Sequence, residues 1–323
     1  MSAVVCTLFE DHYHFGVAAL TNSLCLKGFN GDIFAGYKGN LPAWCSESKE
    51  NPSLKWKGAK TLPVSKGVNV HFLPLETSYH LANYKPDFML KLWEGPAKEA
   101  TEMFYFDPDI IVKENWAVFM KWVKCGVTLC EDVNSPLAMH HPRRFEWRKF
   151  FKTAGIDLQF KEAVYANSGF IGISFMNKSF LNTWVKTQDT IASVIGGLER
   201  SPFSGNGFLP EEHRGDYAPF SKTDQDALNC AVEAWIGNVS FIGKEGMALK
   251  SGPNLMSHAL GKPKPWHWKP LKQAVLGQPP RLMVRDYWEH ANGFLLSQPT
   301  ILVTQRKVTI KIAALIGRFY RRR

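Results

Sequence analysis

Short apolar runs alternate with amphipathic stretches along much of the chain. Helical periodicity predicts one helix over Phe15–Leu26 and another near Asp87–Trp93. Strands are predicted at Ala3–Leu8, Asp32–Tyr37, Val68–Leu73, Met103–Phe106, Gly126–Cys130, Phe170–Phe175 and Val239–Ile242. Strands that alternate with helices indicate an α/β fold with a mainly parallel sheet, whose binding sites lie at the carboxyl ends of the strands.

Two segments depart from this alternation. Ser201–Lys222 is rich in glycine, proline and charge, and predicts a long loop of the kind that acts as a lid or binding segment. After about Pro270 the sequence becomes basic and is punctuated by prolines. We therefore predict a main domain, residues 1–269, and a basic C-terminal extension, residues 270–323.

The composition is that of a globular protein, with 323 residues of which 45% are hydrophobic and 21% charged. No apolar run approaches the roughly 20 residues that cross a membrane. The N-terminus lacks a basic region, and Glu10 and Asp11 interrupt its apolar run, which argues against a signal peptide. The six cysteines show no C-x-x-C spacing. They predict free thiols in a reducing cytoplasm.

The net charge of +10 predicts anionic partners, and part of the excess is concentrated at the C-terminus. There, ILVTQRKVTIKIAALIGRFYRRR interleaves apolar and basic residues. Such a stretch could lie on an anionic membrane, at about 1 kcal/mol per basic residue. A solvated tail or a helix packed on the domain would give the same pattern. The sequence contains no recognised nucleic-acid-binding module. A second basic group is predicted to be a surface loop: His140, His141, Arg143 and Arg144.

The sequence MFYFDPDIIVKENW places two carboxylates inside an apolar run. If the strand ends at Phe106, Asp107 and Asp109 follow at its carboxyl edge. Two oxygen ligands there suit Mn²⁺ or Mg²⁺, which take further ligands from water and substrate phosphates. A solvated turn is an equally good reading of this short motif alone. A phosphohydrolase pair is a poorer one, since no hydroxyl residue follows Asp109.

Three further segments carry candidate chemistry. In SHALGKPKPW, His258 could complete a metal site, Gly261 permits close backbone approach and Lys264 offers a cation to a diphosphate. TDQDALN has Thr223 as a candidate N-cap, followed by Asp224 and Gln225. YANSGFIGIS places small polar residues before a buried strand, where they would form a turn or contact a sugar: Asn167, Ser168 and Gly169.

Taken in their order along the chain, these four segments resemble the retaining glycosyltransferases of family eight. That family includes glycogenin and bacterial lipopolysaccharide α-galactosyl- and α-glucosyltransferases. FDPD is similar to the family's DxD, ANSG to its N-[AS]-G, and DQDALN to its DQDxLN. HALGKPKPW fits HxxGxxKPW at every fixed position. The resemblance spans roughly residues 1–268. It implies a Rossmann-like GT-A fold that binds a nucleotide sugar, usually a UDP-sugar.

Carried over by residue, the resemblance implies that Asp107, Asp109 and His258 hold Mn²⁺ (or Mg²⁺) at the diphosphate. Gly261 and Lys264 would contact the diphosphate itself. The remaining implied donor contacts are Thr7 at the base or ribose, and Asn167, Ser168, Gly169, Asp132, Asp224 and Gln225 around the sugar. Gln225 would face the anomeric carbon, and Gln225 and Asp224 are the implied catalytic residues.

The sequence departs from the family pattern in three places. Phe9 and Glu10 lengthen the segment after the first strand, which puts the base contact in doubt. The family's Arg-Leu before the DxD is missing, so that Lys85 or Lys91 would supply its charge. Asp132 lies in LCEDV, where the match to a family aspartate is loose.

The resemblance implies a hexosyltransferase that moves a hexose from a UDP-sugar to a saccharide or lipid-linked acceptor with retention. The location expected is cytoplasmic, peripheral on the inner face of a membrane. A sugar nucleotidyltransferase is the alternative enzyme, although Val4–Gly16 lacks a glycine-rich phosphate loop. A non-catalytic carbohydrate-binding protein is the second alternative, but it would have little use for three metal ligands.

Overall fold

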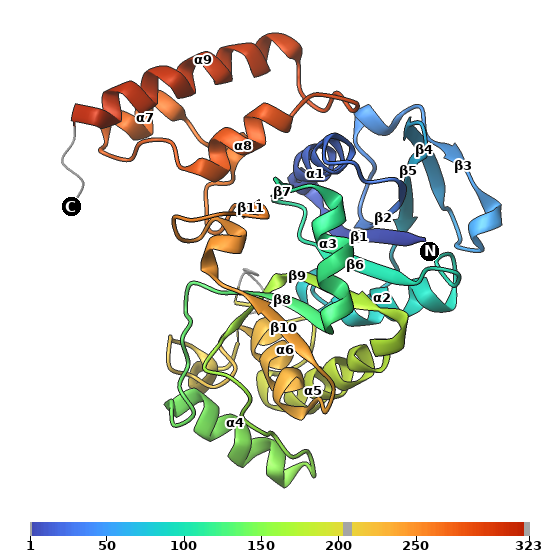
Figure 1. The fold of residues 1–323 in the computed structure, drawn as a ribbon, viewed down its shortest axis with the longest axis vertical. Helices are drawn as coiled ribbons and strands as arrows, with labels where there is room; N and C mark the ends of the chain where they lie inside the picture. The colour runs from blue at the N-terminus through green and yellow to red at the C-terminus, as the bar shows by residue number, and fades with distance from the viewer. Residues whose placement is uncertain (1, 203–208, 320–323) are drawn as a thin grey trace.

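The computed structural model describes residues 2–202 and 209–319. Its centre is a nine-stranded sheet in the order β10-β8-β9-β6-β1-β2-β5-β4-β3 (Figure 1). The strands are β1 (Ala3–Glu10), β2 (Gly31–Lys38), β3 (Lys49–Glu50), β4 (Lys60–Ser65), β5 (Val68–Pro74), β6 (Glu102–Phe106), β8 (Val127–Glu131), β9 (Ala166–Ser174) and β10 (Val239–Ile242). All seven predicted strands are present. The β3–β4 hairpin at one edge was not predicted.

The sheet is mixed but mainly parallel, as predicted. β1 pairs in parallel with β2 and β6, β2 with β5, and β8 with β10. β9 runs antiparallel between β6 and β8, and β4 runs antiparallel to β3 and β5. Because the other strands share one direction, their carboxyl ends meet at a common edge, where α/β sheets place their sites.

Helices cover both faces of this sheet because buried residues alternate along its strands. Val5 and Phe104 pack with α1 and α3, whereas Val4 and Tyr105 pack on the opposite face with α2, α5 and α6. The helices are α1 (His14–Leu26), α2 (Lys85–Glu94), α3 (Trp116–Trp122), α4 (Pro142–Thr153), α5 (Ser179–Ile195), α6 (Thr223–Ala234), α7 (Pro270–Val275), α8 (Leu282–His290) and α9 (Thr300–Ile316). The predicted helices correspond to α1 and α2.

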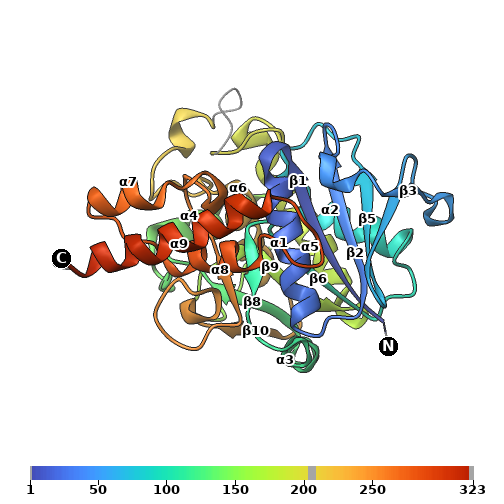
Figure 2. The same ribbon diagram turned by 90° about the horizontal axis from the view of Figure 1, so that it is seen from above.

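The C-terminal helices join the main domain through a third apolar cluster. In it, Tyr287 and Trp288 of α8 pack with Ala19 of α1 and with Trp266. α9 lies beside α7 at the outside of the molecule (Figures 1 and 2). None of the described helices is long and apolar enough to cross a membrane. Of the basic tail, Arg321–Arg323 lie outside the described residues.

The prediction of a basic surface loop before residue 145 is wrong for its two arginines. Arg143 and Arg144 belong to α4 and are each only 2% exposed. The Arg143 guanidinium pairs with Asp226 of α6, and Arg144 Nε lies 3.3 Å from Glu233 Oε1 of the same helix. Charged side chains of this kind are buried when they are paired, and these pairs fasten α4 to α6.

Candidate active site

Asp107 and Asp109 lie where the predicted strand ends. β6 stops at Phe106, and a separate short strand, β7 (Ile110–Val112), begins directly after Asp109. The Asp107 N–H donates to the Gly169 carbonyl at 2.7 Å, which ties the turn to β9. The two carboxylates are therefore at the carboxyl edge of the sheet, as predicted, and the apolar residues that follow them form a second strand.

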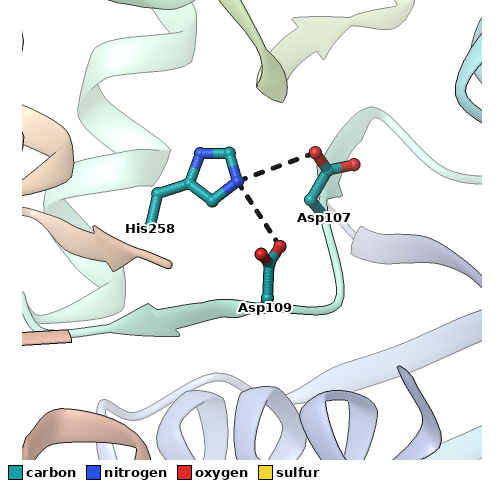
Figure 3. Close-up of side chains that lie close together, drawn as sticks. All are labelled: Asp107, Asp109 and His258. Carbon is teal, nitrogen blue, oxygen red and sulfur yellow. Dashed lines mark ion pairs between the residues drawn. The ribbon is translucent and has the colours of Figure 1, made fainter. Parts of the chain in front are cut away.

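A two-stranded ribbon brings His258 to these carboxylates. β7 pairs antiparallel with β11 (Met256–His258), and His258 lies opposite Ile110. His258 Nε2 is 3.4 Å from Asp109 Oδ1 and 3.8 Å from Asp107 Oδ2 (Figure 3). One ligand atom from each of the three residues lies within 4.8 Å of the others. The structure thus brings together the three predicted metal ligands.

Two glycines allow the surrounding backbone to approach this cluster. A Cβ on Gly169 would lie 2.5 Å from His258 Cε1 and 3.0 Å from Asp107 Oδ2. A Cβ on Gly16 of α1 would lie 2.1 Å from the Pro108 carbonyl oxygen. Main chain at Gly169 and Gly16 therefore packs directly against the ligands and the turn between the two aspartates. A side chain at either glycine would displace these residues.

The donor set fits a divalent cation. Two carboxylates and one imidazole are ligands that Mn²⁺ accepts readily, and the remaining coordination positions would be left to water and substrate. Asp109 is buried, which by itself would raise its pKa, but Lys264 and His258 outweigh the burial and hold the pKa below its usual range. Asp109 is therefore ionised and ready to act as a ligand at neutral pH.

Lys264 reaches the same carboxylate from the other side. Its Nζ donates to Asp109 Oδ2 at 2.5 Å and to the Ala259 carbonyl at 2.8 Å, and lies 5.7 Å from the centroid of the Tyr13 ring. Gly261, in the left-handed region at φ +80°, makes the turn between His258 and Lys264. The turn places a cation and an open backbone beside the candidate metal site, where both residues line a cleft.

The structure distinguishes between the two lysines considered for the family's missing arginine. Lys85 is 2% exposed, and its Nζ lies 3.2 Å from Asp107 Oδ1 and 3.1 Å from Asp224 Oδ2. Burial would lower the Lys85 pKa, but the two carboxylates raise it above its usual value. Lys91 instead donates to the Tyr84 hydroxyl at 2.7 Å, away from the carboxylates. Lys85 is therefore the cation that links the DPD turn to α6.

The DQD segment lies at the start of α6, beside the ANSG segment. Ser168 Oγ donates to Asp224 Oδ2 at 2.6 Å, and the Ser168 N–H donates to Gln225 Oε1 at 3.3 Å. Among the described residues, Gln225 Nε2 has no hydrogen-bond partner. The N-cap prediction for Thr223 is wrong: the helix begins at Thr223, and its hydroxyl donates instead to Asn83 Oδ1 at 2.9 Å.

Asn167 and Asp132 form the far wall of the cleft. Asn167 Nδ2 donates to Asp132 Oδ2 at 2.7 Å, and Asn167 Oδ1 accepts from the Gly169 N–H at 2.8 Å. The second Asp132 oxygen accepts from the Asn134 N–H at 2.9 Å. Both side chains are buried, and these hydrogen bonds hold all four of their side-chain polar atoms, so that the two residues give the cleft a rigid wall.

The cleft has a volume of about 540 Å³. Thr7 does not line it, because its side chain is fully buried within β1. Glu10 at the end of β1 and Tyr13 in the turn that follows line it instead, together with His80. The sequence offered a signal for the first two, since the apolar run Ala3–Phe9 is followed by Glu10 and, three residues later, by Tyr13. All other predicted site residues except Gly169 line this cleft, and Gly169 lies against the metal ligands.

No protein-family model matches the sequence, and no curated protein matches it at a significant level. Solved structures do resemble it. Galactosyltransferase LgtC, solved with donor and acceptor sugar analogs, superposes with a TM-score of 0.50 at 14% identity, over 94% of this chain and 99% of that chain. The apo form of glycosyltransferase GlyE from Streptococcus pneumoniae TIGR4 gives a TM-score of 0.52 at 13% identity, over 94% of this chain and 63% of GlyE.

The bifunctional glycosyltransferase WbbM, solved in its apo form, gives a TM-score of 0.51 at 13% identity. The match covers 95% of this chain, which spans about half of WbbM, 52% of its length. At such low identity these likenesses establish the fold, a mixed and mainly parallel sheet of the Rossmann-like GT-A type. The predicted fold class is thereby confirmed.

Proposed function

We propose that this protein is a metal-dependent glycosyltransferase that moves a hexose from a UDP-sugar to a saccharide or lipid-linked acceptor, with retention. One observation carries the proposal: Asp107, Asp109 and His258, from segments far apart in the sequence, converge beside Lys264 in a large cleft at the carboxyl edge of the sheet. LgtC, which shares the fold, was solved with donor and acceptor sugar analogs.

The three ligands would hold Mn²⁺ or Mg²⁺ in this cleft. When bound, the cation would supply Lewis-acid stabilisation of the negative charge that develops on the departing diphosphate. Lys264 adds a fixed positive charge at the same place, and Gly261 leaves its backbone open to phosphate oxygens. Lys264 would exchange its present bond with Asp109 for one with the diphosphate.

The sugar would lie between α6 and β9. Asn167, Asp132 and Ser168 offer hydrogen-bonding atoms from the wall of the cleft, while Asp224 is held by Lys85. Gln225 is the residue we assign to the anomeric carbon. Gln225 lines the cleft beside the ANSG segment, and its Oε1 accepts from the Ser168 N–H at 3.3 Å. A carbonyl oxygen has a second lone pair, which would be available to the sugar.

The reaction replaces one bond at the anomeric carbon by another. The bond to the diphosphate oxygen breaks, the acceptor hydroxyl oxygen forms the new bond on the same face, and its proton passes to the departing diphosphate. Positive charge accumulates on the sugar meanwhile. Gln225, whose side chain is a neutral amide, would stabilise that charge through its oxygen without forming a bond to the sugar.

The outer face of the α7–α9 pair is the surface we propose for membrane contact, at the cytoplasmic side. Exposed apolar residues lie on one face of α9, and basic residues lie beside them. The apolar group is Ile301, Val308, Ile312 and Leu315. The exposed basic residues are Lys311 in the last turns of α9 and Arg318 directly after the helix. Co-sedimentation with anionic vesicles should fall when Lys311–Arg323 are deleted, and neutral vesicles serve as control. Equal partitioning of both chains would exclude this contact.

A thermal-shift panel of nucleotide sugars with Mn²⁺ or EDTA tests the donor site. At least one UDP-sugar should raise the midpoint in Mn²⁺ only, and Asp107→Ala and His258→Ala should abolish the shift. Activity towards a sugar 1-phosphate and UTP would support the nucleotidyltransferase. The absence of any shift or turnover with every nucleotide sugar would favour a carbohydrate-binding protein.

A further inference from the structure

The β7–β11 ribbon carries part of the metal site but is too short to be stable by itself. Each strand has three residues, and isolated two-stranded ribbons are marginal even when longer. It nevertheless sets the positions of Asp109 and His258, because His258 pairs with Ile110 and Asp109 directly precedes Ile110. Support must therefore come from the elements packed on it, which include α1, α8 and the 3-10 helix Lys244–Met247.

α8 makes a polar connection to both strands of the ribbon. One carboxylate oxygen of Asp286 accepts from Ser257 Oγ in β11, and the other pairs with Lys113 Nζ directly after β7. Asp286 is 4% exposed and Ser257 is fully buried. Because side chains alternate along a strand, Ser257 points to α8 while the next residue, His258, points to the carboxylates.

We propose that Asp286 is a positioning residue for the metal site, an inference that rests on the proposed function. Its carboxylate fastens the two strands to one helix, so that His258 and Asp109 keep the spacing that a cation requires. Ligands must be held within about 0.2 Å of ideal distances, and outer partners of metal ligands commonly change affinity 10- to 100-fold.

The same helix, α8, also contacts the two residues that follow Lys264. Trp288 Nε1 donates to the Pro265 carbonyl at 3.1 Å, directly after Lys264, and the Tyr287 ring lies 5.3 Å from that of Trp266. α8 thus contacts both the ribbon that carries the metal ligands and the residues next to Lys264, the proposed diphosphate contact. On this account, α8 of the C-terminal extension helps to position the site residues, whereas α9 does not.

The test is a calorimetric titration of the full-length protein with Mn²⁺ alone. Asp286→Ala should weaken the Kd at least tenfold. Asp286→Asn, which can still accept from Ser257 but carries no charge for Lys113, should restore part of the affinity. Glu289→Ala is the matched control, because Glu289 lies on the same helix and pairs with Lys307 of α9 at 3.1 Å; its Kd should be unchanged.

Thermal unfolding without metal separates positioning from simple stability. If Asp286→Ala lowers the midpoint but binds Mn²⁺ with the wild-type Kd, Asp286 is only structural and the inference fails, while the proposed function stands. If the alanine variant does not fold, Ser257→Ala removes one hydroxyl from the same connection and decides the matter by the same criterion. A wild-type chain that does not bind Mn²⁺ would overturn both the inference and the metal site.

Discussion

Replacing Gly169 by alanine would place a methyl group inside the candidate metal centre. The backbone at Gly169 is not left-handed, so alanine adds no backbone strain there. Its Cβ would, however, lie 2.5 Å from His258 Cε1, about 0.9 Å short of the 3.4 Å at which ordinary contact begins. Asn167 Oδ1 at 2.8 Å and Asp107 Oδ2 at 3.0 Å block retreat in other directions.

The displacement is large on the scale that a metal site tolerates. Metal–ligand distances are fixed to about 0.2 Å, and a misplacement of about 1 Å in an active site can cost roughly 100-fold in rate. We therefore expect Gly169→Ala to weaken Mn²⁺ binding 10- to 100-fold, measured by calorimetry, with a parallel loss of Mn²⁺-dependent turnover. The circular dichroism spectrum should remain that of the wild type.

Gly172→Ala is the matched control from the same strand. Its Cβ would crowd Thr128 Oγ1 at 2.4 Å and Phe104 Cδ1 at 2.7 Å, inside the core. This variant should unfold at a lower temperature but bind Mn²⁺ normally. A folded Gly169→Ala chain with wild-type Mn²⁺ affinity would refute the reasoning, because it would show that His258 does not bind the cation in this arrangement.

Three further outcomes are expected. Gly16→Ala should lower the unfolding temperature despite the better helix propensity of alanine, because its Cβ would lie 2.1 Å from the Pro108 carbonyl; a raised midpoint would contradict this packing. Arg143→Ala should cost roughly 3–5 kcal/mol in urea unfolding, since it leaves Asp226 buried and unpaired, whereas exposed Lys149→Ala should cost almost nothing. Addition of EDTA to the Mn²⁺-loaded chain should lower the midpoint to that of the metal-free wild-type chain, because a ligand that binds only the folded state raises it; an unchanged midpoint would speak against the site.

The sheet could be predicted because buried parallel strands are near-continuous apolar runs, which the sequence displays at β1 and β6, and because apolar residues alternate with polar ones at β5. The β7–β11 ribbon could not be predicted in the same way. Its strands are three residues long, and their pairing joins distant parts of the chain. The sequence motifs predicted Asp109 and His258 as separate candidate metal ligands. The pairing of β7 with β11 explains why the two residues lie close together.

Residue types misled the sequence interpretation where tertiary partners decide burial. Arg143 and Arg144 are basic and adjacent, which is typical of surface residues. They are nevertheless buried, because each forms an ion pair with an acidic residue of α6. Thr7 has the right chemistry for a nucleotide contact but points into the core of the sheet. The role of Asp286 left no sequence signal, because one aspartate in an amphipathic helix is indistinguishable from a solvated one.

The central claim is that Asp107, Asp109 and His258 bind a cation that a UDP-sugar needs in order to react. The most direct measurement is UDP release from UDP-glucose and UDP-galactose by the wild type, Asp107→Ala and His258→Ala, each in Mn²⁺ and in EDTA. We predict release by the wild type in Mn²⁺ only, with both variants reduced at least 100-fold. Equal release by the variants, or by the wild type in EDTA, would contradict the account.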